Sequence, residues 1–194
     1  TNCTVSGNMA GVGGGGGIVN GRGALTLTNC TVSGNEASDG AYGGGILNSG
    51  TLTLTNCTVS NNTASAYSGG GIVNSGGTVT LTDCTVSGNT ASAFAFACTG
   101  DGGGISNWDG TVTLTNCMVS GNEAADNGGG IHNLSGGTVT LTDCTVSGNM
   151  AGSDYDSGYD SERGSGGGIY NSSGGTVTLT NCTVSGNEAT GNEA

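Results

Sequence analysis

The sequence has no proline, few aromatic residues and two basic residues, Arg22 and Arg163. Charged residues make up 8% of the chain, against about 25% in an ordinary globular domain. Because phosphate groups are bound mainly by lysine and arginine, a net charge of -12 argues against nucleic acid and anionic membranes as partners. No apolar run approaches the roughly 20 residues of a membrane-spanning helix, so the sequence predicts no membrane span.

Glycine is abundant instead, with 43 copies among 194 residues. Glycine together with serine, threonine and asparagine is typical of disordered chains. Here, however, the aliphatic residues recur at fixed places in a repeated unit, and a strict repeat of candidate core positions argues against disorder. We therefore interpret the chain as a folded repeat protein.

The repeated unit is clearest from Gly69 to Asn89, which reads GGGIVNSGGTVTLTDCTVSGN. Copies of it cover the chain, and the longer copies carry their extra residues at one place, between S-G-N and the next G-G-G-I. A cysteine marks each unit, with spacings of 27, 27, 27, 33, 27 and 38 residues: Cys3, Cys30, Cys57, Cys84, Cys117, Cys144 and Cys182.

Each unit contains three short β-strand candidates, G-G-I-V-N, T-V-T-L-T and C-T-V-S, bounded by turn residues. None could bury a face alone, but stacked copies would form parallel ladders with rungs about 4.8 Å apart. The sequence predicts an all-β right-handed parallel β-helix, or β-solenoid, with three strands per rung and about six rungs. We expect residues 1–194 to form one domain of a longer repeat protein or a fibre subunit.

Side-chain parity can be followed through the third unit. Val79 and Leu81 are expected to point inward, and the threonines beside them outward. Cys84 and Val86 break this parity, so a one-residue corner is predicted at Asp83. Asparagine or aspartate stands there in every copy, and both tolerate the left-handed backbone that such a corner needs.

The G-G-G-I-x-N and V-S-G-N motifs resemble the GGA[ILV] and F-x-x-N motifs of bacterial polymorphic outer membrane protein repeats. They are also similar to other right-handed parallel β-helix repeats of secreted bacterial surface proteins. The resemblance covers nearly the whole chain, although valine stands where the phenylalanine would be, for example at Val86. It implies a surface-displayed adhesin, stalk or fibre, and it indicates the fold more specifically than the function.

Outward threonines form the most regular predicted surface, a T-x-T array that resembles the ice-binding face of β-solenoid antifreeze proteins. The alternative is that threonine is simply a soluble strand former on a solvent face, and these hydroxyls could also carry O-linked sugars. The rows are Thr51, Thr53, Thr55; Thr78, Thr80, Thr82; Thr111, Thr113, Thr115; Thr138, Thr140, Thr142; and Thr176, Thr178, Thr180.

The cysteines are expected to form a core ladder of buried free thiols, namely Cys30, Cys57, Cys84, Cys117, Cys144 and Cys182. Disulfides are the alternative, because rungs about 4.8 Å apart satisfy the Cα separation of the bond. Parallel side chains that point the same way disfavour it. The spacing supplies no zinc-ligand pattern.

An acidic stretch offers one candidate cation site. Asp154, Asp156, Asp160 and Glu162 resemble a calcium loop with its D-x-D start, although Gly158 stands one position early for an EF-hand. The alternative is a solvated acidic loop without a ligand. Apart from this possible calcium, no cofactor is predicted.

The sequence predicts no enzymatic activity. Polysaccharide-cleaving β-helices use clustered carboxylates on a strand face, because glycoside hydrolysis requires a carboxylate pair. Here the outward position between isoleucine and asparagine holds no carboxylate, and His132 is expected to be an isolated surface histidine. The residues are Val19, Leu47, Val73, Ser106, His132 and Tyr170.

These observations together predict a structural extracellular or cell-surface rod, such as a stalk, filament or adhesin. Its expected partners are its own ends, neighbouring repeats of the same protein, or glycans. The alternative is a binding module, which binds either ice through the threonines or glycans through a loop edge that carries Tyr67, Phe94, Phe96 and Trp108.

Overall fold

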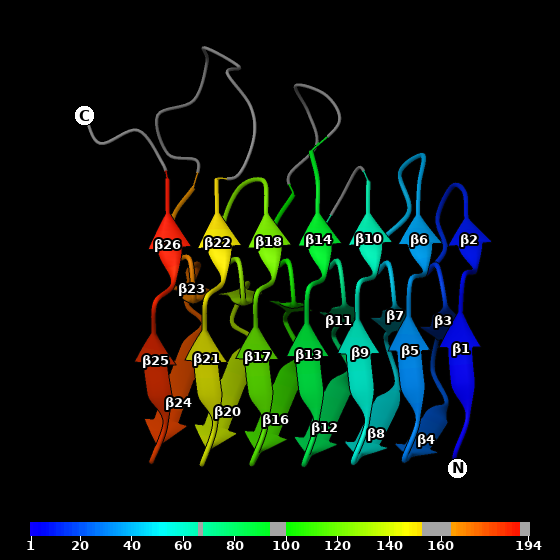
Figure 1. Cartoon of the computed structure of the whole chain (residues 1–194), viewed down its shortest axis with the longest axis horizontal. Coiled ribbons are helices and arrows are strands. Elements are labelled where there is room, and N and C mark those ends of the chain that lie inside the picture. Colours follow the sequence, from blue (N-terminus) through cyan, green and yellow to red (C-terminus); the bar gives the residue numbers. More distant parts are fainter. Residues whose placement is uncertain (66–67, 94–99, 153–163, 191–194) are drawn as a thin grey trace.

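The computed structural model describes residues 1–65, 68–93, 100–152 and 164–190. The regular structure of these residues is entirely β-strand, and successive turns of the chain stack side by side along one axis (Figure 1). All strand pairs are parallel and join equivalent residues of neighbouring repeats, for example Thr80 with Thr113 and Leu81 with Leu114. This confirms the parallel β-helix. No helix in the described part of the chain is long and apolar enough to span a membrane.

The threonine sheet is built from the T-x-T-x-T segments, in which threonine alternates with leucine or valine. Each strand lies parallel to its copy in the next turn, residue for residue. Its six strands are β4 (Ala24–Thr28), β8 (Thr51–Thr55), β12 (Thr78–Thr82), β16 (Thr111–Thr115), β20 (Thr138–Thr142) and β24 (Thr176–Thr180).

The valine sheet follows after a one-residue corner and contains the T-V-S segments. The corner residues have left-handed backbone as predicted, with φ of 54° at Asp83 and 52° at Asn116. The seven strands are β1 (Thr4–Ser6), β5 (Thr31–Ser33), β9 (Thr58–Ser60), β13 (Thr85–Ser87), β17 (Met118–Ser120), β21 (Thr145–Ser147) and β25 (Thr183–Ser185).

The isoleucine sheet contains the strand that follows the G-G-G segment. Its glycines allow close backbone approach: a Cβ at Gly70 would lie 2.5 Å from the Thr90 carbonyl oxygen and 2.6 Å from that of Gly103. The six strands are β3 (Ile18–Asn20), β7 (Ile46–Asn48), β11 (Ile72–Ser75), β15 (Ile105–Trp108), β19 (Ile131–Leu134) and β23 (Ile169–Asn171).

A fourth sheet corrects the predicted three strands per rung. After a glycine with positive φ, such as Gly34 at 62°, the chain turns and two further residues pair with the neighbouring turns. We call this the short-strand sheet; two residues are too few to show an alternating pattern in the sequence. Its strands are β2 (Met9–Ala10), β6 (Glu36–Ala37), β10 (Thr63–Ala64), β14 (Thr90–Ala91), β18 (Glu123–Ala124), β22 (Met150–Ala151) and β26 (Glu188–Ala189).

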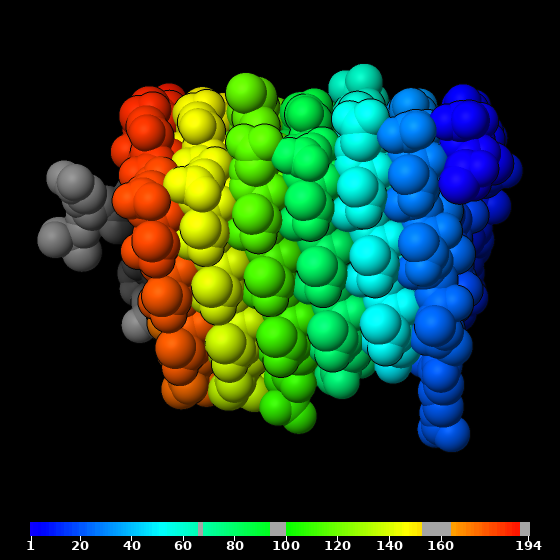
Figure 2. Space-filling view, turned by 90° about the horizontal axis from the view of Figure 1, so that it is seen from below, coloured from blue at the N-terminus to red at the C-terminus, as the bar shows by residue number. Residues whose placement is uncertain are grey.

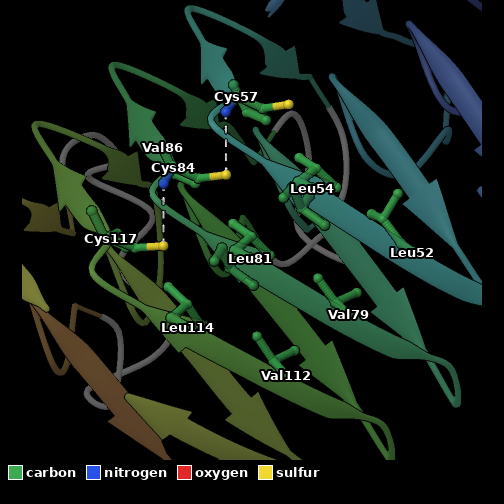
Figure 3. Close-up of a cluster of buried hydrophobic side chains, with 14 of the residues drawn as sticks. Leu52, Leu54, Cys57, Val79, Leu81, Cys84, Val86, Val112, Leu114 and Cys117 are labelled. Carbon is green, nitrogen blue, oxygen red and sulfur yellow. Dashed lines mark hydrogen bonds between the residues drawn. The ribbon is translucent and has the colours of Figure 1, made fainter. Parts of the chain in front are cut away.

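The core is a set of columns in which each residue stacks on its own copy. Val79, Leu81 and Val86 are fully buried, and Cys84 almost fully, as the parity argument predicts. Figure 3 shows Leu81 between Leu54 and Leu114 in adjacent turns. Between the end turns, aliphatic columns of this kind shield the interior from water and supply the main stabilising free energy of the fold.

Two columns of buried asparagine also run along the interior. The Asn89 side-chain Nδ2 donates to Asn122 Oδ1 at 2.9 Å and to the Val59 carbonyl at 3.0 Å, while the Asn89 backbone N–H donates to the same Asn122 Oδ1 at 3.0 Å. Asn74 Nδ2 likewise donates to Asn107 Oδ1 at 2.8 Å. These hydrogen bonds satisfy polar groups that would otherwise be costly to bury.

We predict that Leu81→Asp unfolds the middle turns, whereas Thr80→Asp on the outward side of the same strand leaves the protein folded. Replacing buried Leu81 by a carboxylate should reduce the free energy of unfolding by about 3 kcal/mol or more. Thermal unfolding followed by circular dichroism measures both variants. Equal melting temperatures for Leu81→Asp and the wild type would contradict the inward assignment.

Candidate functional site

The threonine sheet presents a regular outer surface. We call its outward threonines on β8, β12, β16, β20 and β24 the threonine face; the corresponding positions of β4 hold Ala24, Thr26 and Thr28. Every threonine of the face is exposed or half-buried. The side chains form three columns, which begin at Thr51, Thr53 and Thr55 and continue in register from turn to turn.

The turns that make up this surface keep a constant direction. Figure 2 shows the turns of the β-helix as parallel bands that lie side by side from one end of the molecule to the other. Side chains repeat about every 6.7 Å along a strand and about every 4.8 Å between strands. The threonine face is therefore a two-dimensional array of one side-chain type.

The cysteine column lies inside the fold. Cys57 donates its backbone N–H to Cys84 Sγ at 3.4 Å and its thiol to the Thr55 carbonyl at 3.2 Å, and the pattern recurs from turn to turn. In Figure 3 the sulfur atoms of Cys57, Cys84 and Cys117 point the same way. None of the seven cysteines of the described residues is in a disulfide in this structure, and of the predicted ladder only Cys182 is half-buried rather than buried. Burial raises the pKa of Cys57 and Cys144.

The predicted calcium loop cannot be placed, because Asp154, Asp156, Asp160 and Glu162 lie outside the described residues. Within the described ranges, no group of three or more histidine, cysteine, aspartate or glutamate side chains could hold a metal ion. Calcium at residues 154–162 thus stays a prediction.

The outer side of the isoleucine sheet differs from the prediction. His132 was expected at the surface, but it is 3% exposed, and Val73 and Ser106 of neighbouring turns are buried with it. The parity is correct, since these side chains do point away from the core. They are buried because the first glycine of each G-G-G segment lies against them: a Cβ at Gly69, Gly102 or Gly128 would collide with the side chain of Val73, Ser106 or His132, respectively. Asp101 also lies beside His132.

A buried polar cluster that was not predicted from the sequence lies at this place. Asp101 Oδ2 lies 3.8 Å from His132 Nδ1, and Asp101 Oδ1 accepts hydrogen bonds from the Asn127 backbone N–H at 3.0 Å and from Asn127 Nδ2 at 3.2 Å. Asp126, which is 3% exposed, accepts a hydrogen bond from the Gly100 backbone N–H at 3.1 Å. A signal existed in the sequence: Asp101 and Asn127 both stand directly before G-G-G.

The environment of His132 favours its neutral form. Its Nδ1 is buried without a hydrogen-bond partner, and its ring centroid lies 5.3 Å from that of Tyr170. Burial lowers the pKa of His132, and the nearby Asp101 carboxylate opposes that shift only in part. Asp101 and Asp126 are buried and bind backbone N–H groups of neighbouring connections, so this cluster holds the connections against each other.

The predicted aromatic loop edge is only partly described. Tyr67, Phe94 and Phe96 lie outside the described residues. Trp108 is half-buried, donates its Nε1–H to Ser106 Oγ at 2.9 Å and packs edge-on against Tyr42 at a centroid distance of 5.4 Å. Its indole N–H is thus already satisfied within the protein.

One turn per repeat, with parallel strands in exact copy-to-copy register, is the geometry of a β-helix, and the family comparison agrees with it. A family model described as "Right handed beta helix region" matches residues 1–184. The chain belongs to the right-handed β-helix family. No curated protein and no solved structure matches it. The family match leaves the resemblance to polymorphic outer membrane protein repeats as a prediction.

For the cysteine column of this β-helix, we predict slow thiol labelling in the native state. In a variant with Cys3, Cys98 and Cys182 replaced by serine, all the remaining cysteines are buried. A thiol reagent should react with them only after denaturation, because their side chains are buried and the reagent cannot reach the sulfur atoms in the folded protein. Denatured protein without titratable thiols would instead show that disulfides had formed.

For the buried histidine of this β-helix, we predict that the free energy of unfolding decreases as the pH is lowered. The pKa of His132 is lower in the folded state than its unfolded value of about 6.5, so the unfolded chain binds more protons as the pH falls below that value. His132 therefore destabilises the fold from about pH 6.5 downward.

Chemical denaturation between pH 8 and pH 5 tests this by comparing the wild type with His132→Gln. The wild type should lose more free energy of unfolding over this interval than the variant, since both share every other titrating group. Parallel pH profiles for the two proteins would refute the assignment.

Proposed function

We propose that this β-helix is the structural part of an extracellular or cell-surface protein, a rigid rod that carries variable connections along one edge. The observation that supports it most directly is that insertions leave the register unchanged. Cys84 and Cys117 are 33 residues apart and Cys144 and Cys182 are 38 apart, against 27 for Cys57 and Cys84. All these turns pair their strands in the same way.

The internal bonding supports the stiffness of such a rod. Adjacent turns are joined by four parallel sheets, by the aliphatic columns and by two asparagine columns. Bending would have to lengthen the hydrogen bonds of the sheets on the outer side of the bend and compress the columns on its inner side. Stalk, filament and adhesin roles all use this property, with neighbouring repeats of the same protein or end-to-end copies as the proposed partners.

The proposal predicts that the longest insertion can be removed without harm to the rod. Exchanging residues 152–165 for the three residues Ala125–Asn127 shortens the Cys144–Cys182 spacing from 38 to 27 residues. Because the strands before and after the insertion pair in the same register as in the other turns, thermal unfolding and the rod dimensions from small-angle X-ray scattering should stay the same.

A matched deletion inside a strand provides the control for that experiment. Removing Thr140 alone shifts every later residue of β20 to the opposite face, and this variant should lose its cooperative melt. A shortened connection that also abolished folding would overturn the display role, because the insertion would then belong to the fold itself.

A binding module is the second candidate function. It is favoured by the threonine face, whose side chains are in register and which no described segment buries. Glycan binding through the loop edge has less support, because three of its four predicted aromatic residues lie outside the described residues.

A further inference from the structure

We propose that the ligand of the threonine face is the surface of ice. This inference rests on the second candidate function, in which the threonine face is a binding surface, and it names the ligand. It is carried by three properties of the face: its two-dimensional periodicity, the chemistry of its single residue type and the absence of charge from its outward positions.

Periodicity restricts the class of partner. In β12, β16 and β20 the outward positions are all threonine, and equivalent residues pair directly, as in Thr80 with Thr113 and Thr113 with Thr140. On a surface with the same chemical group at every lattice point, a protein partner could bind equally well at many shifted positions, so the surface does not specify one binding mode. A crystal face matches it, because a crystal also repeats the same group along two directions.

Threonine has the chemistry to order water along such a lattice. Each residue supplies a hydroxyl that can donate and accept hydrogen bonds, and a methyl group that leaves neighbouring waters to bond with one another. Its branched β-carbon restricts χ1, so hydroxyls in a strand are held in place before a ligand arrives. Waters held between fixed hydroxyls lose little further entropy when they join a solid.

The same chemistry disfavours other ligands. Protein interfaces rely on buried tryptophan, tyrosine or arginine anchors, and phosphate ligands need basic residues. Hydrogen bonds from hydroxyls to a polysaccharide replace equally good bonds to water, so without aromatic or amide groups the net gain is small. The nearest charges among the described residues, Asp83 and Asp143 at one corner and Asp109 at the other, stand beside the face and not within it.

The valine sheet supplies an internal comparison. Its outward positions are also hydroxyl-bearing in most turns, but its strands are only three residues long, so it carries two columns. Met118, which is 47% exposed, interrupts one of them in the middle of the rod. This surface is therefore narrower and broken, and substitutions on it make matched controls.

The test uses lysine substitutions in alternate turns, so that the new charges do not stack on one another. Thr80→Lys with Thr140→Lys changes the threonine face, and Thr85→Lys with Thr145→Lys changes the valine sheet in the same two turns. Recrystallisation of ice and partition of the protein into a growing ice crystal are measured, with circular dichroism melts to establish folding.

The wild type and the valine-sheet variant should both inhibit recrystallisation and enter the ice, whereas the threonine-face variant should behave like buffer. If the lysine pair impairs folding, Thr113→Tyr replaces it as the threonine-face variant, because tyrosine is bulky, neutral and favours strands. Met118→Tyr, on the valine sheet of the same turn, is its control. A wild type that neither inhibits recrystallisation nor enters ice overturns the proposal, as does equal loss in the two variants.

A second experiment tests whether the threonine face is a binding surface independently of whether its ligand is ice. The same proteins are mixed with microcrystalline cellulose and chitin, and the bound fraction is measured. If the wild type adsorbs to a polysaccharide but not to ice, and the threonine-face variant loses adsorption, the binding face stands and ice as its ligand is overturned. If the wild type binds neither ice nor either polysaccharide, both the assignment of the threonine face as a binding surface and the assignment of ice as its ligand are overturned.

Discussion

Every turn of this β-helix stacks directly on a copy of itself, so the nearest neighbour of each side chain along the axis is usually its own equivalent. A column can therefore contain only residues that tolerate their own kind at about 4.8 Å. Leucine and valine do so by dispersion and water exclusion. Asparagine does so because its amide carries both a donor and an acceptor, and threonine does so because it stays hydrated on the outside.

The same constraint accounts for the scarcity of charge. Like charges directly opposite one another on neighbouring strands are destabilising, and the few carboxylates are placed accordingly. At the corners, Asp83 and Asp143 are separated by Asn116, whose Nδ2 donates to Asp83 Oδ1. In the short-strand sheet no two glutamates are neighbours; the outward column runs Met9, Glu36, Thr63, Thr90, Glu123, Met150 and Glu188.

How far the fold follows from sequence depends on how much of each segment is repeated. The T-V-T-L-T strand and the corner at Asp83 were predictable, because alternation and a left-handed position each leave a mark in every copy. The short-strand sheet was not, since two residues cannot display a period. His132 was assigned to the correct side of its strand, but it was expected at the surface and is buried. The connections that cover this side differ in length and sequence from turn to turn, so they leave no repeating signal from which the burial could be predicted.

The variable connections and the regular threonine sheet lie on different parts of each turn. The longest connections lie between the short-strand sheet and the isoleucine sheet, and in Figure 1 those that follow β2, β6 and β18 rise above the strands. The threonine sheet lies elsewhere on the turn and has five-residue strands throughout. Changes in a connection can therefore accumulate without altering the threonine face.

The two interior asparagine columns also give the rod a direction. In both, each side-chain Nδ2 donates toward the C-terminal neighbour, as from Asn62 to Asn89 and from Asn107 to Asn133. The amide dipoles therefore add head to tail, as peptide dipoles do along an α-helix. A cut between two turns would leave the Nδ2 donors of these Asn-to-Asn bonds on the N-terminal piece and their Oδ1 acceptors on the C-terminal piece. The two asparagine columns are thus polar along the axis, so the two directions of the rod are chemically distinct although its turns are nearly identical.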